Sequence, residues 1–467
     1  MSDYDLIVIG SGPAGHHAAI QGAKLGRRVA IVERQPSLGG VCMNTGTIPS
    51  KTLREAVLYL SGVHQRGFYG VSYRVKPQVT MQDLMFRCHH VIQREVDVYR
   101  AQFARNGVDV LEGEASFQDP HTVLVTAPGT RQLFRAHRFV IATGTAPVRP
   151  RGMPTDHGAV IDSDGLFQLG GVPRSMIVIG GGVIGMEYAC MFSTLGVSVT
   201  VVDGRHRLLD FLDSEIVDAL VYHMRTAGVT FRLGEVVEGV EWVEGRRVVA
   251  HLASHKQLHA ETLLCAAGRQ GNTAGLNLEA AGLRPDARGR LPVDSEFRTA
   301  VSHIYAAGDV VGFPSLASVS MEQGRVASAS AFGLPSVTVP ALFPYGIYTI
   351  PEVSFVGRTE EELTDAQVPY EVGIANYREI ARGGIIGDTI GRLKLLFHRE
   401  TGAVLGVHII GDGATELVHI GQAVIALGGT IRYFIDHVFN YPTLAECYKV
   451  AALAGLNKLP GGGAEIR

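Results

Sequence analysis

The feature that most constrains the fold is an internal repeat. The segment "DLIVIGSGPAGHHAAIQGAKLGRRVAIVER", which begins at Asp5, recurs with the same spacing as "SMIVIGGGVIGMEYACMFSTLGVSVTVVDG", which begins at Ser175. Each copy has an apolar run, a glycine-rich turn, a helix-like stretch and a second apolar run that ends on an acid. Short β-branched runs of this kind are typical of buried strands in a parallel sheet. The sequence therefore predicts two similar α/β units.

The glycines and the final acid of each copy are those that a dinucleotide site needs. The first glycine permits a tight turn, the second lets the backbone approach a pyrophosphate, and the third allows close packing of helix and strand. The helix N-terminus faces the phosphates, and the acid accepts a hydrogen bond from the adenosine ribose. These positions are Gly10, Gly12, Gly15 and Glu33 in the first copy, and Gly180, Gly182, Gly185 and Asp203 in the second. One such motif is weak evidence, but two complete copies predict two bound dinucleotides.

The alternative is a duplication that left one site vacant, and three further segments argue against it. "FVIATGTAPVRP" (139–150) contains Thr143 and Gly144, and "LLCAAGRQGN" (263–272) contains Gly268. Each places an apolar strand before a small-residue turn, where each half would close beside its nucleotide. "HIYAAGDVVGFPSLASVSMEQGRVAS" (303–328) puts Asp309 at a strand end, before a helix expected to begin near Ser315. This element serves only the first half, so the two nucleotides are not expected to be equivalent.

Length and composition limit the class of protein. A chain of 467 residues is expected to form two to four domains. The net charge of −3 does not favour a nucleic-acid or anionic-membrane partner. The chain shows neither a signal peptide at its start nor an apolar run near the ~20 residues of a membrane span. The five cysteines lack metal-ligand spacing and fit free thiols in a reducing cytosol. We therefore expect a soluble, cytoplasmic protein that binds no metal.

On these motifs the chain resembles, over essentially its full length, the pyridine nucleotide–disulfide oxidoreductase family, which includes dihydrolipoamide dehydrogenase and glutathione reductase. The resemblance implies an α/β fold with two Rossmann-like dinucleotide-binding domains, one for FAD and one for NAD(P), and a C-terminal α+β dimerisation domain. It implies a homodimer. The expected division is 1–150 for the first part of the FAD-binding domain, 151–274 for the NAD(P)-binding domain, 275–344 for the second part of the FAD-binding domain and 345–467 for the dimerisation domain.

The resemblance also implies roles for particular residues. FAD would lie against Gly10, Gly12, Gly15, Glu33, Cys42, Thr47, Thr143 and Gly144, with Asp309 on its ribityl chain. The nicotinamide nucleotide would lie against Gly180, Gly182, Gly185, Asp203, Arg205, Arg207 and Gly268. Lys51 resembles the family lysine at the flavin edge, and Glu187 resembles its ion-pair partner. The alternative is an unrelated surface lysine and helix glutamate.

Two departures from the family pattern concern thiol chemistry. In "GGVCMNTGTIPSK" (39–51) the position of a second redox cysteine holds Thr47, so Cys42 has no partner for a dithiol there. In "FNYPTLAE" the position of the family's histidine base holds Tyr441, and a tyrosine with a pKa near ~10 is a poor base at neutral pH. The matching Glu446 remains without an imidazole to orient. His437 is a possible substitute, although a lone histidine near an apolar stretch is more often structural.

The combination of Cys42, Thr47 and Tyr441 resembles one branch of the family, the soluble Si-specific NAD(P) transhydrogenases. It implies a flavoprotein that passes hydride between NADPH and NAD by a ping-pong route, with Cys42 as a structural thiol. Two other functions stay open: an NAD(P)H diaphorase or quinone reductase, and a nucleotide-sensing subunit without turnover. Asp203 favours the bare ribose of NAD, whereas Arg205 and Arg207 suit a 2′-phosphate or are solvent-facing loop charges.

Overall fold

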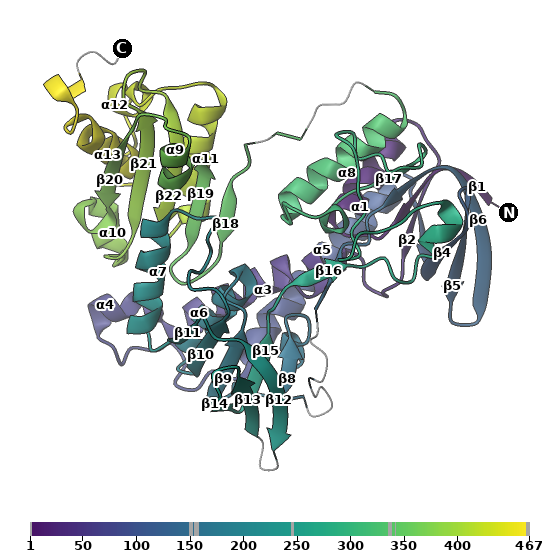
Figure 1. The fold of residues 1–467 in the computed structure, drawn as a ribbon, viewed down its shortest axis with the longest axis horizontal. Helices are drawn as coiled ribbons and strands as arrows, with labels where there is room; N and C mark the ends of the chain where they lie inside the picture. The colour runs from purple at the N-terminus through teal and green to yellow at the C-terminus, as the bar shows by residue number, and fades with distance from the viewer. Residues whose placement is uncertain are drawn as a thin grey trace.

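The computed structural model describes residues 2–148, 153, 158–243, 247–334, 339–340 and 342–463. Figure 1 shows three groups of elements that form an open arc, with the N-terminal group at one end and the C-terminal group at the other. The second glycine-rich unit lies between them. No helix in the described ranges is both long enough and apolar enough to cross a bilayer.

The first copy of the repeat lies in a seven-stranded sheet of order β3-β2-β1-β6-β5-β4, in which β17 also pairs with β6. The strands are β1 (Ser2–Ile9), β2 (Val29–Glu33), β3 (Asp109–Glu112), β4 (Glu114–Asp119), β5 (Thr122–Ala127), β6 (Thr130–Ile141) and β17 (Ile304–Ala306). The central strands are parallel, because β1 pairs in parallel with both β2 and β6, and β17 pairs in parallel with β6. A strand far along the chain thus returns to the first sheet and brings Asp309 to its edge.

Helices cover this sheet and extend from it. They are α1 (Pro13–Lys24), α2 (Gly40–Asn44), α3 (Thr47–Ser61), α4 (Arg66–Tyr69), α5 (Met81–Arg105) and α8 (Ala317–Ala331). The α1 helix starts with Pro13, whose missing amide proton costs nothing at the first helical position. It packs unusually close to α8, because a Cβ on Gly324 would lie 2.0 Å from the carbonyl oxygen of Ala14. The predicted helix near Ser315 is present as α8, which begins at Ala317.

The second copy lies in a five-stranded parallel sheet of order β11-β10-β9-β15-β8. Its elements are β8 (Val160–Asp162), β9 (Ser175–Ile179), β10 (Ser198–Asp203), β11 (Thr230–Leu233) and β15 (Thr262–Cys265), with the helices α6 (Val183–Thr194) and α7 (Ser214–Thr226). An antiparallel sheet of β12 (Val237–Val243), β13 (Arg247–Leu252) and β14 (Gln257–Ala260) lies beside it. The short strands β7 (Thr145–Pro147) and β16 (Arg269–Gly271) pair with each other and join the two units.

The C-terminal group is an antiparallel sheet of order β18-β19-β22-β21-β20 with helices against it. The strands are β18 (Tyr345–Ile347), β19 (Val353–Gly357), β20 (Tyr370–Asn376), β21 (Arg392–His398) and β22 (Val404–Ile410). The helices are α9 (Glu360–Asp365), α10 (Ala381–Ile386), α11 (Ala414–Ala426), α12 (Arg432–Asp436) and α13 (Glu446–Leu456). Figure 1 shows α7 of the second unit reaching this group.

The predicted fold class is confirmed: two parallel α/β units are followed by an α+β unit. The residue-level division stays a prediction, and its boundary at residues 150 and 151 lies outside the described residues. Two features bear on that division. The strand β17 belongs to the first sheet, and β18 begins the antiparallel C-terminal sheet at Tyr345.

Candidate active site

The two glycine-rich turns have the same geometry. Gly10 has a φ of +102° and Gly180 a φ of +99°, in the region where side chains are strained. A Cβ on Gly15 would lie 1.8 Å from the carbonyl oxygen of Gly10, and a Cβ on Gly185 would lie 1.9 Å from that of Gly180. Both turns therefore exclude side chains at these positions, so that each helix can pack tightly on its strand.

The middle glycine of each turn is open instead of crowded. A Cβ on Gly12 or Gly182 would meet no atom within 4 Å. The two residues are the N-caps of α1 and α6, so the free amides of each first helical turn begin beside an open backbone. Such a helix terminus binds anions, and a pyrophosphate can approach a backbone without side chains. Both turns therefore fit a dinucleotide.

The acid at the end of each second strand is buried and held by the turn. The Glu33 carboxylate accepts hydrogen bonds from the Ser11 amide at 3.0 Å and the Ser11 hydroxyl at 2.6 Å. The Asp203 carboxylate accepts one from the Gly181 amide at 2.7 Å. Burial alone would raise the pKa of Asp203, but hydrogen bonds from Arg205 and this amide lower it. Asp203 thus stays ionised beside its glycine turn, and both carboxylates are placed as acceptors for ribose hydroxyls.

A cavity of about 760 Å³ opens at the first turn. Its lining includes the predicted residues Gly10, Gly12, Glu33, Cys42, Thr47, Thr143, Gly144 and Asp309. The hydroxyl of Thr143 is buried and has no partner among the described residues, which fits a polar ligand in the cavity. The residues that the sequence assigns to FAD thus surround one cavity, except Gly15, which lies behind the turn and shapes it.

Asp309 and the start of α8 form one wall of this cavity. Asp309 follows β17 after Ala307 and Gly308, and the Ser320 hydroxyl of α8 donates a hydrogen bond to its carboxylate at 3.3 Å. Burial raises the pKa of Asp309, and the charge of Arg269 acts in the opposite direction. Ser315 and Ala317 at the start of α8 also line the cavity. The positive end of the helix dipole therefore faces the enclosed space.

Lys51 and Glu187 form the ion pair that the sequence predicts. The Lys51 ammonium lies 3.0 and 2.8 Å from the two carboxylate oxygens of Glu187. The Tyr348 amide donates to the same carboxylate at 2.9 Å, and the ammonium lies 4.8 Å from the centre of the Tyr348 ring. The side chain of Glu187 is only 4% exposed and that of Lys51 is 27% exposed. The pair joins α3, α6 and the segment after β18, which an unrelated surface lysine would not do.

Cys42 is a buried free thiol. All five cysteines of the chain are buried. Burial raises the pKa of Cys42, while a hydrogen bond with Thr47 acts against the rise. The thiol is therefore protonated at neutral pH, when it is a poor nucleophile.

The C-terminal residues at the family's base position lie elsewhere. Tyr441 is 67% exposed. The exposed His437 bonds the carbonyl oxygen of Tyr433 at 3.0 Å through Nδ1 and stacks on the same residue's ring. One carboxylate oxygen of Glu446 is buried without a partner among the described residues. None of Tyr441, His437 and Glu446 belongs to the described lining of the cavity in the same chain.

Both arginines after Asp203 have side chains that are 47% exposed, and both are in ion pairs. Recognition of a 2′-phosphate by these arginines stays a prediction, as does the alternative that they are solvent-facing loop charges. Arg205 contacts Asp203 through two nitrogens, at 3.0 and 2.9 Å. Arg207 contacts Glu361 of α9 at 3.0 Å. Gly268 has a φ of +124°, and a Cβ there would meet nothing within 4 Å. It follows β15 at an open turn of the second unit.

Sequence reasoning missed Arg269, which links the two units. Its guanidinium donates to the hydroxyl and the carbonyl oxygen of Thr145 at 2.9 and 2.8 Å, and it lies 3.3 Å from Asp164. The only signal was an arginine inside "LLCAAGRQGN", because its partners lie more than a hundred positions away in the chain.

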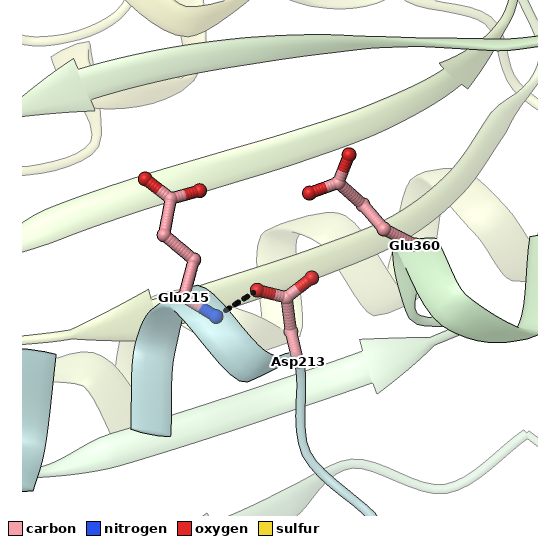
Figure 2. A group of neighbouring side chains, drawn as sticks. All are labelled: Asp213, Glu215 and Glu360. Carbon is pink, nitrogen blue, oxygen red and sulfur yellow. Dashed lines mark hydrogen bonds between the residues drawn. The ribbon is translucent and has the colours of Figure 1, made fainter. Parts of the chain in front are cut away.

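Three carboxylates converge where α7 and α9 begin, as Figure 2 shows for Asp213, Glu215 and Glu360. The ammonium of Lys394 lies between them, 2.9 Å from Asp213 and 3.1 Å from Glu215, and it also bonds Glu360. A lysine therefore supplies the positive charge that this group needs, and the cluster is an ion-pair network between the second unit and the C-terminal sheet.

Comparisons with known proteins agree with this geometry. Residues 4–324 match the model of the "Pyridine nucleotide-disulphide oxidoreductase" family, and residues 343–452 match its dimerisation domain. A protein of Mycobacterium bovis named soluble pyridine nucleotide transhydrogenase is 56% identical over 461 residues, which cover 98% of each chain. A protein of the same name from Colwellia psychrerythraea is 46% identical, over 98% of this chain and 99% of that one.

Solved structures give the same result. The HOCl-induced flavoprotein disulfide reductase RclA of Escherichia coli superposes with a TM-score of 0.86 at 29% identity, over 96% of this chain and 99% of that one. LpdA of Mycobacterium tuberculosis superposes with a TM-score of 0.88 at 25% identity, over 97% of this chain and 99% of that one. With both domain models matched and relatives alike over nearly their full length, the chain belongs to the pyridine nucleotide-disulphide oxidoreductase family.

Proposed function

We propose that this protein is a soluble pyridine nucleotide transhydrogenase, an FAD-dependent oxidoreductase that moves hydride between NADPH and NAD. The observation that carries the proposal is the combination of two dinucleotide turns and an intact Lys51–Glu187 pair with a free, protonated Cys42. The parts that serve hydride transfer are present, whereas the dithiol that would pass electrons to a disulfide is not. The relatives of this name, at 46% and 56% identity, support the same function.

FAD, when bound, supplies a carrier that accepts hydride from one nicotinamide and returns it to another. The chain's own residues bind and orient it. Gly12 and the start of α1 receive the pyrophosphate, Glu33 the adenosine ribose, and Asp309 the ribityl chain. Gly182, the start of α6 and Asp203 play the corresponding parts for the nicotinamide nucleotide.

Lys51 acts as a fixed positive charge at the flavin edge. Glu187 holds and orients the ammonium, because a lysine paired with a buried carboxylate avoids the cost of an isolated buried charge. Together with the positive end of α8, the Lys51 ammonium stabilises negative charge that develops beside the ammonium. Cys42 has a packing role and takes no part in electron transfer.

The proposal includes a ping-pong order, a homodimer and a cytoplasmic location. A single nicotinamide site beside the flavin requires the first product to leave before the acceptor binds. The matched dimerisation domain supports a homodimer. Free cysteines such as Cys42, Cys88, Cys190 and Cys447 favour a reducing compartment.

The test is anaerobic mixing of the FAD-loaded protein with NADPH, followed by thio-NAD, whose reduced form absorbs separately. We expect NADPH to bleach the flavin and thio-NAD to restore it, with parallel initial-rate lines for donor against acceptor. Intersecting lines without substrate inhibition would indicate a ternary complex and contradict the ping-pong order.

Two other outcomes would identify the other functions. A flavin that a quinone reoxidises much faster than thio-NAD would indicate a diaphorase. A flavin that neither NADH nor NADPH reduces would indicate a nucleotide-sensing subunit.

A further inference from the structure

The loop after Asp203 lies against the second glycine turn. Leu208 is 2% exposed, and a Cβ on Gly181 would lie 2.3 Å from its side chain. Arg205 and Arg207 flank the middle of this loop, four positions or fewer from the acid that receives the adenosine ribose. A phosphate on the 2′-oxygen of that ribose would therefore arrive beside the loop that carries both arginines.

Neither arginine is free to receive such a phosphate. Arg205 is held by Asp203 of its own unit through a two-nitrogen contact. Arg207 is held by Glu361, which belongs to α9 of the C-terminal group, at 3.0 Å. The Arg207 and Glu361 side chains are 47% and 39% exposed, so a ligand in solution can compete for the pair.

Glu361 is a fixed anion. The carboxylate oxygen that contacts Arg207 also accepts a hydrogen bond, at 3.2 Å, from the Ser214 amide at the start of α7. Burial acts to raise the pKa of Glu361, but hydrogen bonds with Ser214, its own amide and Arg207 bring it to about 2. The carboxylate therefore keeps its charge throughout the neutral range.

The position of Glu361 is also fixed. Its neighbour Glu360 bonds the buried Lys394, which in turn contacts Asp213 and Glu215. Figure 2 shows the beginnings of α7 and α9 facing each other at this group. The anchored beginnings of α7 and α9 thus hold Glu361 in contact with Arg207.

We propose that Glu361 is a specificity-determining residue, which disfavours NADPH by holding Arg207 away from the 2′-phosphate. The inference rests on the proposed function, in which both nucleotides bind at this turn. To contact Arg207, the 2′-phosphate of NADPH would have to separate Arg207 from Glu361. NADH has a bare ribose, so its binding does not require the pair to separate. Glu361 contacts neither the glycine turn nor Asp203 among the described contacts, so it acts only through Arg207.

The experiment compares two probes that differ by one group, adenosine 2′,5′-bisphosphate and adenosine 5′-monophosphate. Their dissociation constants are measured by calorimetry on the FAD-loaded protein at fixed salt. Glu361→Gln keeps an acceptor for the Ser214 amide but removes the charge. Because partly exposed ion pairs contribute little, we expect it to tighten bisphosphate binding about two- to fivefold and to leave monophosphate binding unchanged.

Two further variants separate the pair from general charge. Glu296→Gln removes the same charge from a similar pair, Arg298–Glu296, at 2.8 Å and 41% exposure of the glutamate, and should leave both probes unchanged. Arg207→Ala combined with Glu361→Gln should lose the gain and bind the bisphosphate no better than Arg207→Ala alone. If Glu361→Gln does not fold, Glu361→Asp, which shortens the side chain and lengthens the contact, should give a smaller gain of the same kind.

A gain that survives without Arg207, an equal change for both probes, or no change at all would overturn the inference. None of these outcomes depends on turnover. Absence of hydride transfer between NADPH and thio-NAD in the unaltered protein would instead overturn the proposed function, so the two failures are distinguishable.

Discussion

At the scale of single residues, Lys51 is the side chain whose charge has the most direct part in the proposed chemistry. We expect Lys51→Met to slow flavin reduction by NADPH about 10²- to 10³-fold, since one preorganised electrostatic donor contributes ~2.7–4 kcal/mol. Nucleotide binding should change far less. Stopped-flow single-turnover reduction against nucleotide titration separates the two effects.

Glu187 complicates the Lys51 variant, because the substitution leaves a carboxylate that is 4% exposed without its partner. Lys51→Met combined with Glu187→Gln removes this burden and should keep the slow reduction. Lys76→Met is the matched control. Lys76 pairs with Asp83 at 2.6 Å, and neither residue belongs to the described lining of the cavity. Reduction at the parent rate in Lys51→Met would exclude Lys51 from the flavin edge.

Cys42 lines the cavity, but its removal should matter little. Cys42→Ser should retain FAD and keep nucleotide-driven flavin reduction within about tenfold, or roughly 1.4 kcal/mol of barrier. The reason is that Thr47 stands where a second redox cysteine would be, and burial raises the pKa of the Cys42 thiol. The measurement is flavin content and stopped-flow reduction. Turnover lost completely from a flavin-loaded Cys42→Ser would show that the thiol takes part in the chemistry.

Sequence reasoning worked at this scale where both partners lie in recognisable motifs. Lys51 and Glu187 could be paired because each lies in a recognisable motif and the resemblance to the family implies that the two form an ion pair. Arg269 and Glu361 could not be identified, because neither residue lies at a position with a local role. Their contacts arise only when segments distant in sequence meet, as Glu361 meets Arg207 across the second unit and the C-terminal group.

At the scale of elements, the second strand–turn–helix unit contains one glycine with open space around it, Gly182, and one that is crowded by backbone, Gly185. Gly182→Ala should leave the midpoint of thermal unfolding almost unchanged, because a Cβ there meets nothing within 4 Å. It should weaken NADH and NADPH binding, because the methyl group lies where a pyrophosphate approaches the backbone. Gly185→Ala should instead destabilise the protein by about 1–3 kcal/mol or more, because its Cβ would lie 1.9 Å from a carbonyl oxygen.

Thermal unfolding and nucleotide titration of both variants check this difference, with flavin content as a common readout. FAD should stay bound in Gly182→Ala, since the first unit has its own turn at Gly12. Equal destabilisation by the two substitutions would contradict the structural distinction between an open and a crowded glycine.

Helices and strands could be predicted from the sequence more readily than the burial of their side chains. The segment "GRLKLLFHRE" (391–400) contains β21, and its alternation of polar and apolar residues is typical of a strand with one polar and one apolar face. Lys394 is nevertheless fully buried within it. The hydrophobic periodicity of a strand indicates which side chains avoid water. It does not indicate that acids from α7 and α9 cover the polar face of β21. That information depends on tertiary packing.

At the scale of the whole molecule, Lys394 ties the second nucleotide unit to the C-terminal group. Its ammonium contacts Asp213, which is the N-cap of α7, Glu215 of α7 and Glu360 of α9, so one side chain neutralises acids from two units. Burial acts to lower the pKa of Lys394, but the hydrogen bonds and charges of Glu360 and Asp213 raise it overall. A lysine with a raised pKa adds stability below the ~10.4 of the unfolded chain, which is lost as the pH rises through its folded value.

Lys394→Met should therefore be strongly destabilising at pH 7, by about 3–5 kcal/mol, because it leaves the fully buried Asp213 carboxylate without its cation. The loss should shrink at high pH, where the lysine of the unaltered protein also becomes neutral. Adding Asp213→Asn should recover part of the stability, since Asp213 is as fully buried as Lys394. Denaturant unfolding at pH 7 and in strongly alkaline buffer, with FAD content as a check on the first unit, measures these effects. A Lys394→Met protein as stable as its parent at pH 7 would show that the carboxylates are accommodated without the lysine, and that other contacts join the two units.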